Sequence, residues 1–87
     1  MISLVKPSFW RHLNALPEAE QAAARRAYQL FMDDCGHPSL RFKKLEGEPD
    51  VWSVRISLNL RAVAKREGDT VTWFWIGPHK EFDRLFA

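Results

Sequence analysis

The sequence has little of what stabilises very small domains or anchors a chain in a membrane. It contains one cysteine, Cys35, which excludes an internal disulfide framework and any metal site built from several cysteines. His37 stands beside Pro38 with no second His or Cys at metal-binding spacing, so neither a metal site nor a cofactor is predicted. No apolar run is long enough to cross a bilayer and no signal peptide is recognisable, so we expect a soluble cytoplasmic protein.

Hydrophobic residues, by contrast, are plentiful. They make up 46% of the chain, including four Trp and six Phe, which excludes a disordered tail. One domain spanning residues 1–87 is expected, because 87 residues suffice for one core and not for two. The formal net charge is only +2, yet Lys and Arg outnumber Asp and Glu between residues 40 and 66. Such a local excess indicates either an anionic partner, nucleic acid first, or an ordinary solvated face.

The first part of the chain predicts a short strand and two helices. Met1–Val5 is mostly apolar and stops before Pro7, which is typical of an edge strand. Ser8 is placed to cap a first helix with one buried face. A second helix, rich in alanine, starts at Pro17, and Gly36 is a natural residue for its C-terminal cap.

The second part predicts two antiparallel hairpins. β-Branched and aromatic residues alternate with polar ones, and Gly68-Asp69 is a tight-turn signal between the last two runs. The expected strands are Leu40–Leu45, Trp52–Ser57, Arg61–Arg66 and Thr70–Gly77.

A three-residue turn between the middle two strands would pair Ser57 with Arg61 and Arg55 with Val63. Because side chains alternate across a sheet, one face of this hairpin is then basic and the other is a core. We call the first the basic face; its members are Ser53, Arg55, Arg61, Val63 and Lys65.

The last hairpin is expected to pair small residues with large ones. A two-residue turn at Gly68-Asp69 pairs Ala64 with Trp73 and Ala62 with Trp75. Two further apolar side chains then fall on the basic face and need a cover, which is either the C-terminal tail or a partner protein. These two are Phe74 and Ile76, and the tail residues are Phe82, Leu85 and Phe86.

The ordered set of these segments resembles the RelE/ParE superfamily, the toxins of bacterial type II toxin–antitoxin pairs. The resemblance rests on residues 37–45 (HPSLRFKKL), 52–56 (WSVRI), Arg61 and residues 73–79 (WFWIGPH). It implies an α/β (α+β) fold with a short N-terminal strand, two helices, an antiparallel sheet and a C-terminal tail. It also implies a cytoplasmic antitoxin partner and a toxin–antitoxin hetero-oligomer.

The RelE-like branch of this superfamily cuts ribosome-bound messenger RNA without a metal. Carried over to this chain, Arg55 and Arg61 match arginines that hold the scissile phosphate, and His79 matches a proton-transfer position. Cleavage by the ribose 2′-hydroxyl suits these residue types, because histidine titrates near neutral pH and arginine binds phosphate through two bonds. General contacts to the RNA backbone are expected from Lys43, Lys44, Lys65, Lys80 and Arg84.

Two other functions remain open on the sequence. The ParE-like branch inhibits DNA gyrase by binding, and a simple basic nucleic-acid module needs no catalysis at all. Several nucleases of the family have a tail tyrosine that is missing here, since the sole tyrosine, Tyr28, lies in a helix and is expected in the core. The two arginines could instead form surface ion pairs, which contribute little. The acidic candidates are Glu46, Glu48 and Asp50.

Overall fold

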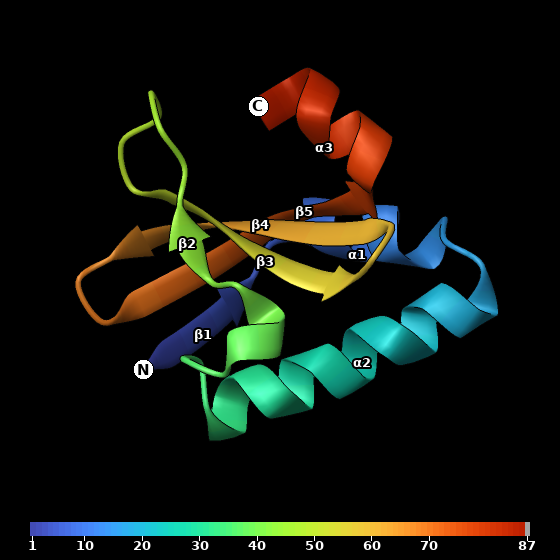
Figure 1. The fold of residues 1–87 in the computed structure, drawn as a ribbon, viewed down its shortest axis with the longest axis horizontal. Helices are drawn as coiled ribbons and strands as arrows, with labels where there is room; N and C mark the ends of the chain where they lie inside the picture. The colour runs from blue at the N-terminus through green and yellow to red at the C-terminus, as the bar shows by residue number, and fades with distance from the viewer. Residues whose placement is uncertain (87) are drawn as a thin grey trace.

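The strands of the protein form one mixed sheet. A computed structural model describes residues 1–86, in which five strands lie in the order β1-β5-β4-β3-β2 (Figure 1). The edge strand β1 runs parallel to β5, and the remaining neighbours are antiparallel. The strands are β1 (Ile2–Val5), β2 (Lys43–Lys44), β3 (Val51–Ser57), β4 (Leu60–Glu67) and β5 (Thr70–Pro78).

The helices cover both faces of this sheet. The long helix α2 runs along one face, and α3 lies on the opposite face (Figure 1). The α+β architecture predicted from the sequence is therefore confirmed, with the tail forming a helix. The helical elements are α1 (Pro7–Asn14), α2 (Glu18–Asp33), the 3₁₀ turn η1 (Pro38–Leu40) and α3 (His79–Phe86).

Each face of the sheet has its own apolar cluster. The larger cluster joins the sheet to α1 and α2, where Phe31 packs edge-on against Trp73 with ring centroids 5.2 Å apart. The smaller cluster joins the sheet to α3 through Phe82, which lies beside Val63 and Trp75. The basic face is consequently interrupted: Ser53 and Val63 are buried at its middle, and only its two ends are open to a ligand.

The β3–β4 hairpin has a tighter turn than predicted. Its turn has two residues, so Arg55 pairs with Arg61, not with Val63, and a bulge at Ile56 lets Ser57 pair with Leu60. The expected pairing was therefore wrong. The faces are nevertheless as predicted, because the pairing moved by an even number of positions, which leaves the alternation unchanged.

A second bulge overturns part of the last hairpin. Ala64 pairs with Trp73 as predicted, but Phe74 is an extra residue in β5, so Val63 faces Trp75. Beyond such a bulge the alternation of side chains is reversed. Ile76 was expected on the basic face and is instead buried in the larger cluster opposite Ala62.

Residues 40–45 do not form the predicted strand. The alternation of this segment is interrupted by the η1 turn, and only Lys43 and Lys44 pair with β3. Arg41 ends the turn in a left-handed backbone conformation, with φ 46° and ψ 47°. Its neighbours hold it there: Leu40 is 2% exposed, and Phe42 packs against Phe31 with ring centroids 5.0 Å apart.

The helix caps also differ from expectation. Ser8 does not cap α1, which begins at Pro7; its hydroxyl donates to the carbonyl of Phe74 at 2.9 Å and ties α1 to β5. Gly36 is not the left-handed cap of α2. The cap residue is Asp34, whose backbone is not left-handed (φ −156°, ψ 86°). Its carboxylate accepts a hydrogen bond from the Gly36 N–H at 3.1 Å, which gives this aspartate a structural role at the end of the helix.

Candidate active site

Three arginines gather where β3 turns into β4. Arg55 and Arg61 are cross-strand partners, so their Cβ atoms are on the order of 5 Å apart on the same face. Arg41 follows the η1 turn and lies near enough to affect the charge of Arg61. These three residues, Arg41, Arg55 and Arg61, are called the arginine cluster.

Arg61 is fixed by the turn that it follows. Its Nη1 donates to the carbonyls of Ser57 at 2.7 Å and Leu60 at 3.1 Å, with a weaker contact to Leu58 at 3.4 Å. Within residues 1–86, its Nε and Nη2 have no protein acceptor. One side of the guanidinium is thus held by the backbone, and the other is free to bind two oxygens of an anion.

The surroundings of Arg61 disfavour its charge. Burial lowers the pKa of Arg61 below its usual value, and the positive charges of Arg55 and Arg41 lower it further, while the Asp83 carboxylate raises it. Like charges placed together in this way destabilise one another until an anion lies between them. The arginine cluster therefore has the electrostatics of an anion-binding site.

His79 lies at the same end of the sheet. It is the first residue of α3, and it follows Pro78, the β5 partner of Leu60. Its backbone N–H donates to the carbonyl of Asn59 at 2.7 Å, which fixes the start of α3 to the β3–β4 turn. The predicted position just past the last strand is confirmed, with a helix beginning there.

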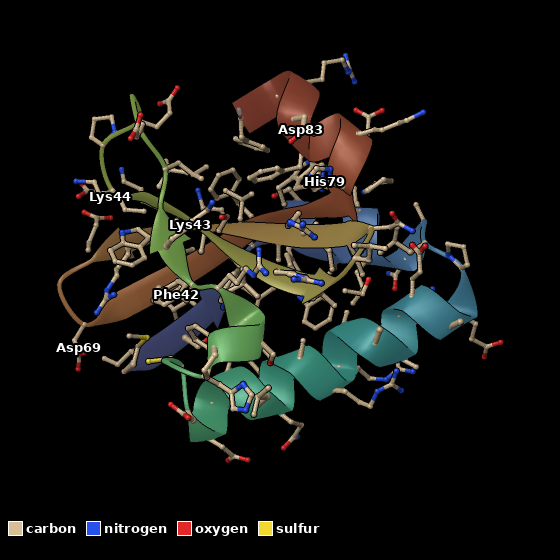
Figure 2. All side chains as sticks on the ribbon, viewed as in Figure 1. Phe42, Lys43, Lys44, Asp69, His79 and Asp83 are labelled. Carbon is tan, nitrogen blue, oxygen red and sulfur yellow. The ribbon has the colours of Figure 1, made fainter. Side chains whose placement is uncertain are left out.

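The side chain of His79 has a carboxylate partner. Asp83, one turn further along α3, places its Oδ2 3.2 Å from Nδ1 of His79 (Figure 2). A carboxylate accepts at this nitrogen, so the pair favours the imidazole tautomer with a proton on Nδ1. The opposite nitrogen, Nε2, then carries the lone pair that can take a proton from a substrate.

The lysines predicted to touch RNA do not all gather here. Lys43 pairs with Ser53 and so shares the face of Arg55, whereas Lys44 pairs with Trp52 and lies on the other face. Lys65 is exposed at the far end of β4, opposite Thr72.

The two predicted RNA contacts on α3 are exposed. Lys80 is free of salt bridges among the described residues. Arg84 forms an ion pair with Glu81 on the same helix. Lys43 and Lys80 are therefore the lysines best placed to extend the site.

Other residues that could carry chemistry lie elsewhere. Tyr28 was expected in the core, but it is 38% exposed on α2, and its hydroxyl bonds to Ser3 Oγ at 2.9 Å on the opposite side of the sheet. Among residues 1–86, no three His, Cys, Asp or Glu side chains come together as a metal site would require. None of the described helices is long and apolar enough to cross a bilayer.

Two members of the site were missed in the sequence. Arg41 was read as part of a strand, because the segment Leu40–Leu45 alternates and contains no glycine that would mark a left-handed turn. Asp83 was not among the candidate residues predicted from the sequence. Its spacing of four from His79 would have identified the pair once the tail was assigned as a helix.

The fold defines a class of proteins. A chain of the RelB–RelE antitoxin–toxin complex from Methanococcus jannaschii is similar with a TM-score of 0.76 at 18% identity, and the match covers 97% of this chain and 99% of that chain. A chain of the E. coli RelBE toxin–antitoxin complex is similar with a TM-score of 0.65 at 14% identity, and the match covers 87% of this chain and 93% of that chain. The YoeB/ParE toxin from Agrobacterium tumefaciens has a TM-score of 0.63 at 17% identity, with 91% of this chain and 99% of that chain covered.

Membership of a family follows from the sequence itself. The family of ParE-like toxin domains matches residues 19–84, so this chain belongs to that family. It is a ParE-like toxin, and its fold is that of the RelE and YoeB/ParE toxins, in agreement with the sequence resemblance. No curated protein matches the sequence significantly.

Proposed function

We propose that this toxin stops translation by cutting messenger RNA on the ribosome without a metal ion. In this proposal an antitoxin protein keeps it inactive in a cytoplasmic complex. The observation that supports it best is the arginine cluster with His79 beside it. An anion site and a proton-transfer group at one end of the sheet are what phosphodiester cleavage needs.

The chemical step places different demands on the two parts of the site. The ribose 2′-oxygen forms a bond to phosphorus, and the bond from phosphorus to the 5′-oxygen of the next nucleotide breaks. The 2′-hydroxyl loses a proton, the departing 5′-oxygen gains one, and negative charge builds up on the pentavalent phosphate. In the proposed mechanism His79 exchanges protons through Nε2, and the arginine cluster stabilises the phosphate oxygens.

The remaining cations supply binding in this proposal. Lys43, on the face of Arg55, and Lys80, which follows His79, add positive charge near the arginine cluster, and Lys65 lies further along the sheet. Contacts of this kind to the RNA backbone carry no base recognition and weaken steeply with salt. Any preference of the cleavage for a sequence would then depend on which part of the messenger RNA the ribosome exposes to the toxin.

Inhibition of DNA gyrase without catalysis is the second candidate, and one observation favours it. Among the described residues, His79 and its partner Asp83 are the only proton-transfer groups identified at the arginine cluster, and Tyr28 lies on the opposite side of the sheet. A binding toxin needs no such group. It would remain toxic when His79 is replaced.

The test compares cleavage with toxicity. The wild-type chain, without a partner, is added to ribosome complexes that carry a messenger RNA, and cut sites are mapped by primer extension. We expect cleavage by wild type and little by His79→Ala, with growth arrest lost in parallel. Growth arrest by His79→Ala together with DNA damage, and no cut messenger for either protein, would instead establish the gyrase-type function.

A further inference from the structure

A second group of aromatic rings and positive charge lies away from the arginine cluster. The guanidinium carbon of Arg66 lies 4.6 Å from the centre of the Trp52 ring and 5.5 Å from the centre of the Phe42 ring. The two rings are themselves in contact, with centroids 4.8 Å apart and planes tilted by 38°. We call these three residues, Arg66, Trp52 and Phe42, the stacked platform. Figure 2 shows Phe42 well to one side of His79 and Asp83.

The core of the protein holds the stacked platform in place. Phe42 packs edge-on against Phe31, which is buried, with ring centroids 5.0 Å apart. The backbone N–H of Arg66 donates to the carbonyl of Asp50 at 2.7 Å, and its Nε lies 3.4 Å from the carbonyl of Gly68. A guanidinium that is positioned by the fold in this way loses less conformational entropy when it binds a ligand.

The outer side of the platform is not used by the rest of the protein. Its three residues are partly exposed. Within residues 1–86, Arg66 forms no salt bridge, and its two terminal nitrogens have no protein acceptor. On the opposite face of the sheet, by contrast, α3 covers the aromatic residues, and Phe74 packs there against Phe86. A stacked guanidinium with free donors is suited to a planar ligand that carries hydrogen-bond acceptors.

An exposed lysine lies beside the platform. Lys44 is the cross-strand partner of Trp52, so their Cβ atoms are on the order of 5 Å apart on the same face. Lys44 forms no salt bridge among the described residues. Its long side chain places a positive charge next to any planar group that stacks on Arg66. A base with its adjoining phosphate offers both the planar group and the negative charge.

The path from the candidate active site to the platform is short. Arg61 and Arg66 are five residues apart in β4, which is about 17 Å along the strand, and they lie on opposite faces of the sheet. The edge strand β2 carries one lysine on each face, Lys43 on the face of Arg55 and Lys44 on the other. An RNA strand bound at the arginine cluster therefore needs only a few nucleotides to pass around this edge and reach the platform.

We propose that the stacked platform is a second RNA site, in which an unpaired base of the bound messenger stacks on Arg66 and the adjoining phosphate binds Lys44. The proposal rests on the proposed nuclease function for the identity of the RNA as messenger. Such a site favours single-stranded RNA, because the bases of a duplex are already stacked on one another. It adds affinity without reading the sequence, because every base has a π-face.

The fluorescence of a base analogue tests the stacking directly. A single-stranded RNA carries 2-aminopurine, whose emission is quenched by stacking, at one position at a time, and 2′-O-methyl groups prevent cleavage. The chain is added at low salt to this RNA, free and in ribosome complexes. We expect quenching a few nucleotides away from the phosphate bound at the arginine cluster. Absence of quenching at every position in both forms would overturn the proposal.

Arg66→Lys separates stacking from charge. It keeps the positive charge and removes the planar guanidinium, so we expect the quenching to be lost and binding to weaken about tenfold. Arg26→Lys is the matched control, because Arg26 is exposed on α2 and forms no salt bridge among the described residues. Lys44→Gln should weaken binding and reduce its dependence on the logarithm of salt concentration by about 1 in slope. Equal quenching and affinity for wild type and Arg66→Lys would overturn the stacking site.

Cleavage separates this inference from the proposed function. Arg66→Lys lies outside the candidate active site, so it should raise KM for the ribosome complex about tenfold and change kcat much less. If wild type cuts no messenger yet quenching depends on Arg66, the nuclease proposal fails and the platform stands as a site for single-stranded RNA. If wild type and Arg66→Lys cut with the same KM and kcat and quench equally, the platform fails and the nuclease proposal stands.

Two other results would assign the platform to a different ligand. Weaker binding of Arg66→Lys to ribosomes that carry no messenger, without quenching in any messenger, would assign it to ribosomal RNA. Weaker binding only to the protein encoded beside the gene would assign it to an acidic protein partner. Either result overturns the proposal that the messenger stacks there.

Discussion

Replacing Arg61 distinguishes a catalytic arginine from a structural one. In the proposed mechanism Arg61→Ala removes a preorganised positive charge from the transition state, which costs about 3 kcal/mol, or about a hundredfold in rate. Arg61→Lys keeps the charge but loses the planar fork, so we expect an intermediate loss of about tenfold. Primer extension on messenger RNA in ribosome complexes measures both.

The same substitution should affect stability much less. Removing Arg61 breaks its hydrogen bonds to the carbonyls of Ser57 and Leu60, which lowers the free energy of unfolding. The pKa of Arg61 is lowered because burial and nearby positive charges disfavour its charge, so removing that charge raises the free energy of unfolding. These effects oppose each other in a partly solvated side chain, so we expect the free energy of unfolding to change by less than about 1 kcal/mol. Urea denaturation provides this control. Cleavage at wild-type rates by both Arg61→Ala and His79→Ala would refute the assignment of the site.

Three further predictions follow from the contacts. Asp83→Asn should slow cleavage and reduce the Nδ1-protonated tautomer of His79, measured by ¹⁵N chemical shifts; an unchanged tautomer would show that the contact is incidental. Arg55→Gln should raise the free energy of unfolding at low salt by up to about 0.5 kcal/mol, because it relieves repulsion in the arginine cluster, and 1 M salt should remove the gain. Gly77→Ala should destabilise the fold by about 1–3 kcal/mol in urea, since a Cβ would lie 2.7 Å from Trp75, and a normal stability would mean that the ring moves freely.

The sequence predicted the arginine pair although it misjudged the turn between the two residues. The turn is one residue shorter than predicted, and the bulge at Ile56 adds a second one-residue shift, so the partner of Arg55 moved by two positions and the two arginines kept the same face. Arg55 and Arg61 therefore stayed together although their predicted partners were wrong.

The bulge in β5 could not be predicted in the same way. Trp73-Phe74-Trp75 contains no glycine and no break in its apolar character, so nothing in it indicates an extra residue. What selects the bulge is packing: Trp75 fills the smaller cluster under α3, and Ile76 the larger one. Such a choice depends on both faces of the finished sheet, as does the position of Arg41.

The parallel pairing of β1 with β5 also affects when the candidate site can form during folding. Ile2 pairs with Thr70, so the sheet joins segments from nearly opposite parts of the sequence. Contacts between residues so far apart in the sequence form late and make folding slower, whereas the helices and hairpins can form from local contacts. His79 directly follows the strand that makes this pairing. A nascent chain therefore cannot assemble the candidate site until β5 and His79 have been synthesised and β5 has closed the sheet against β1.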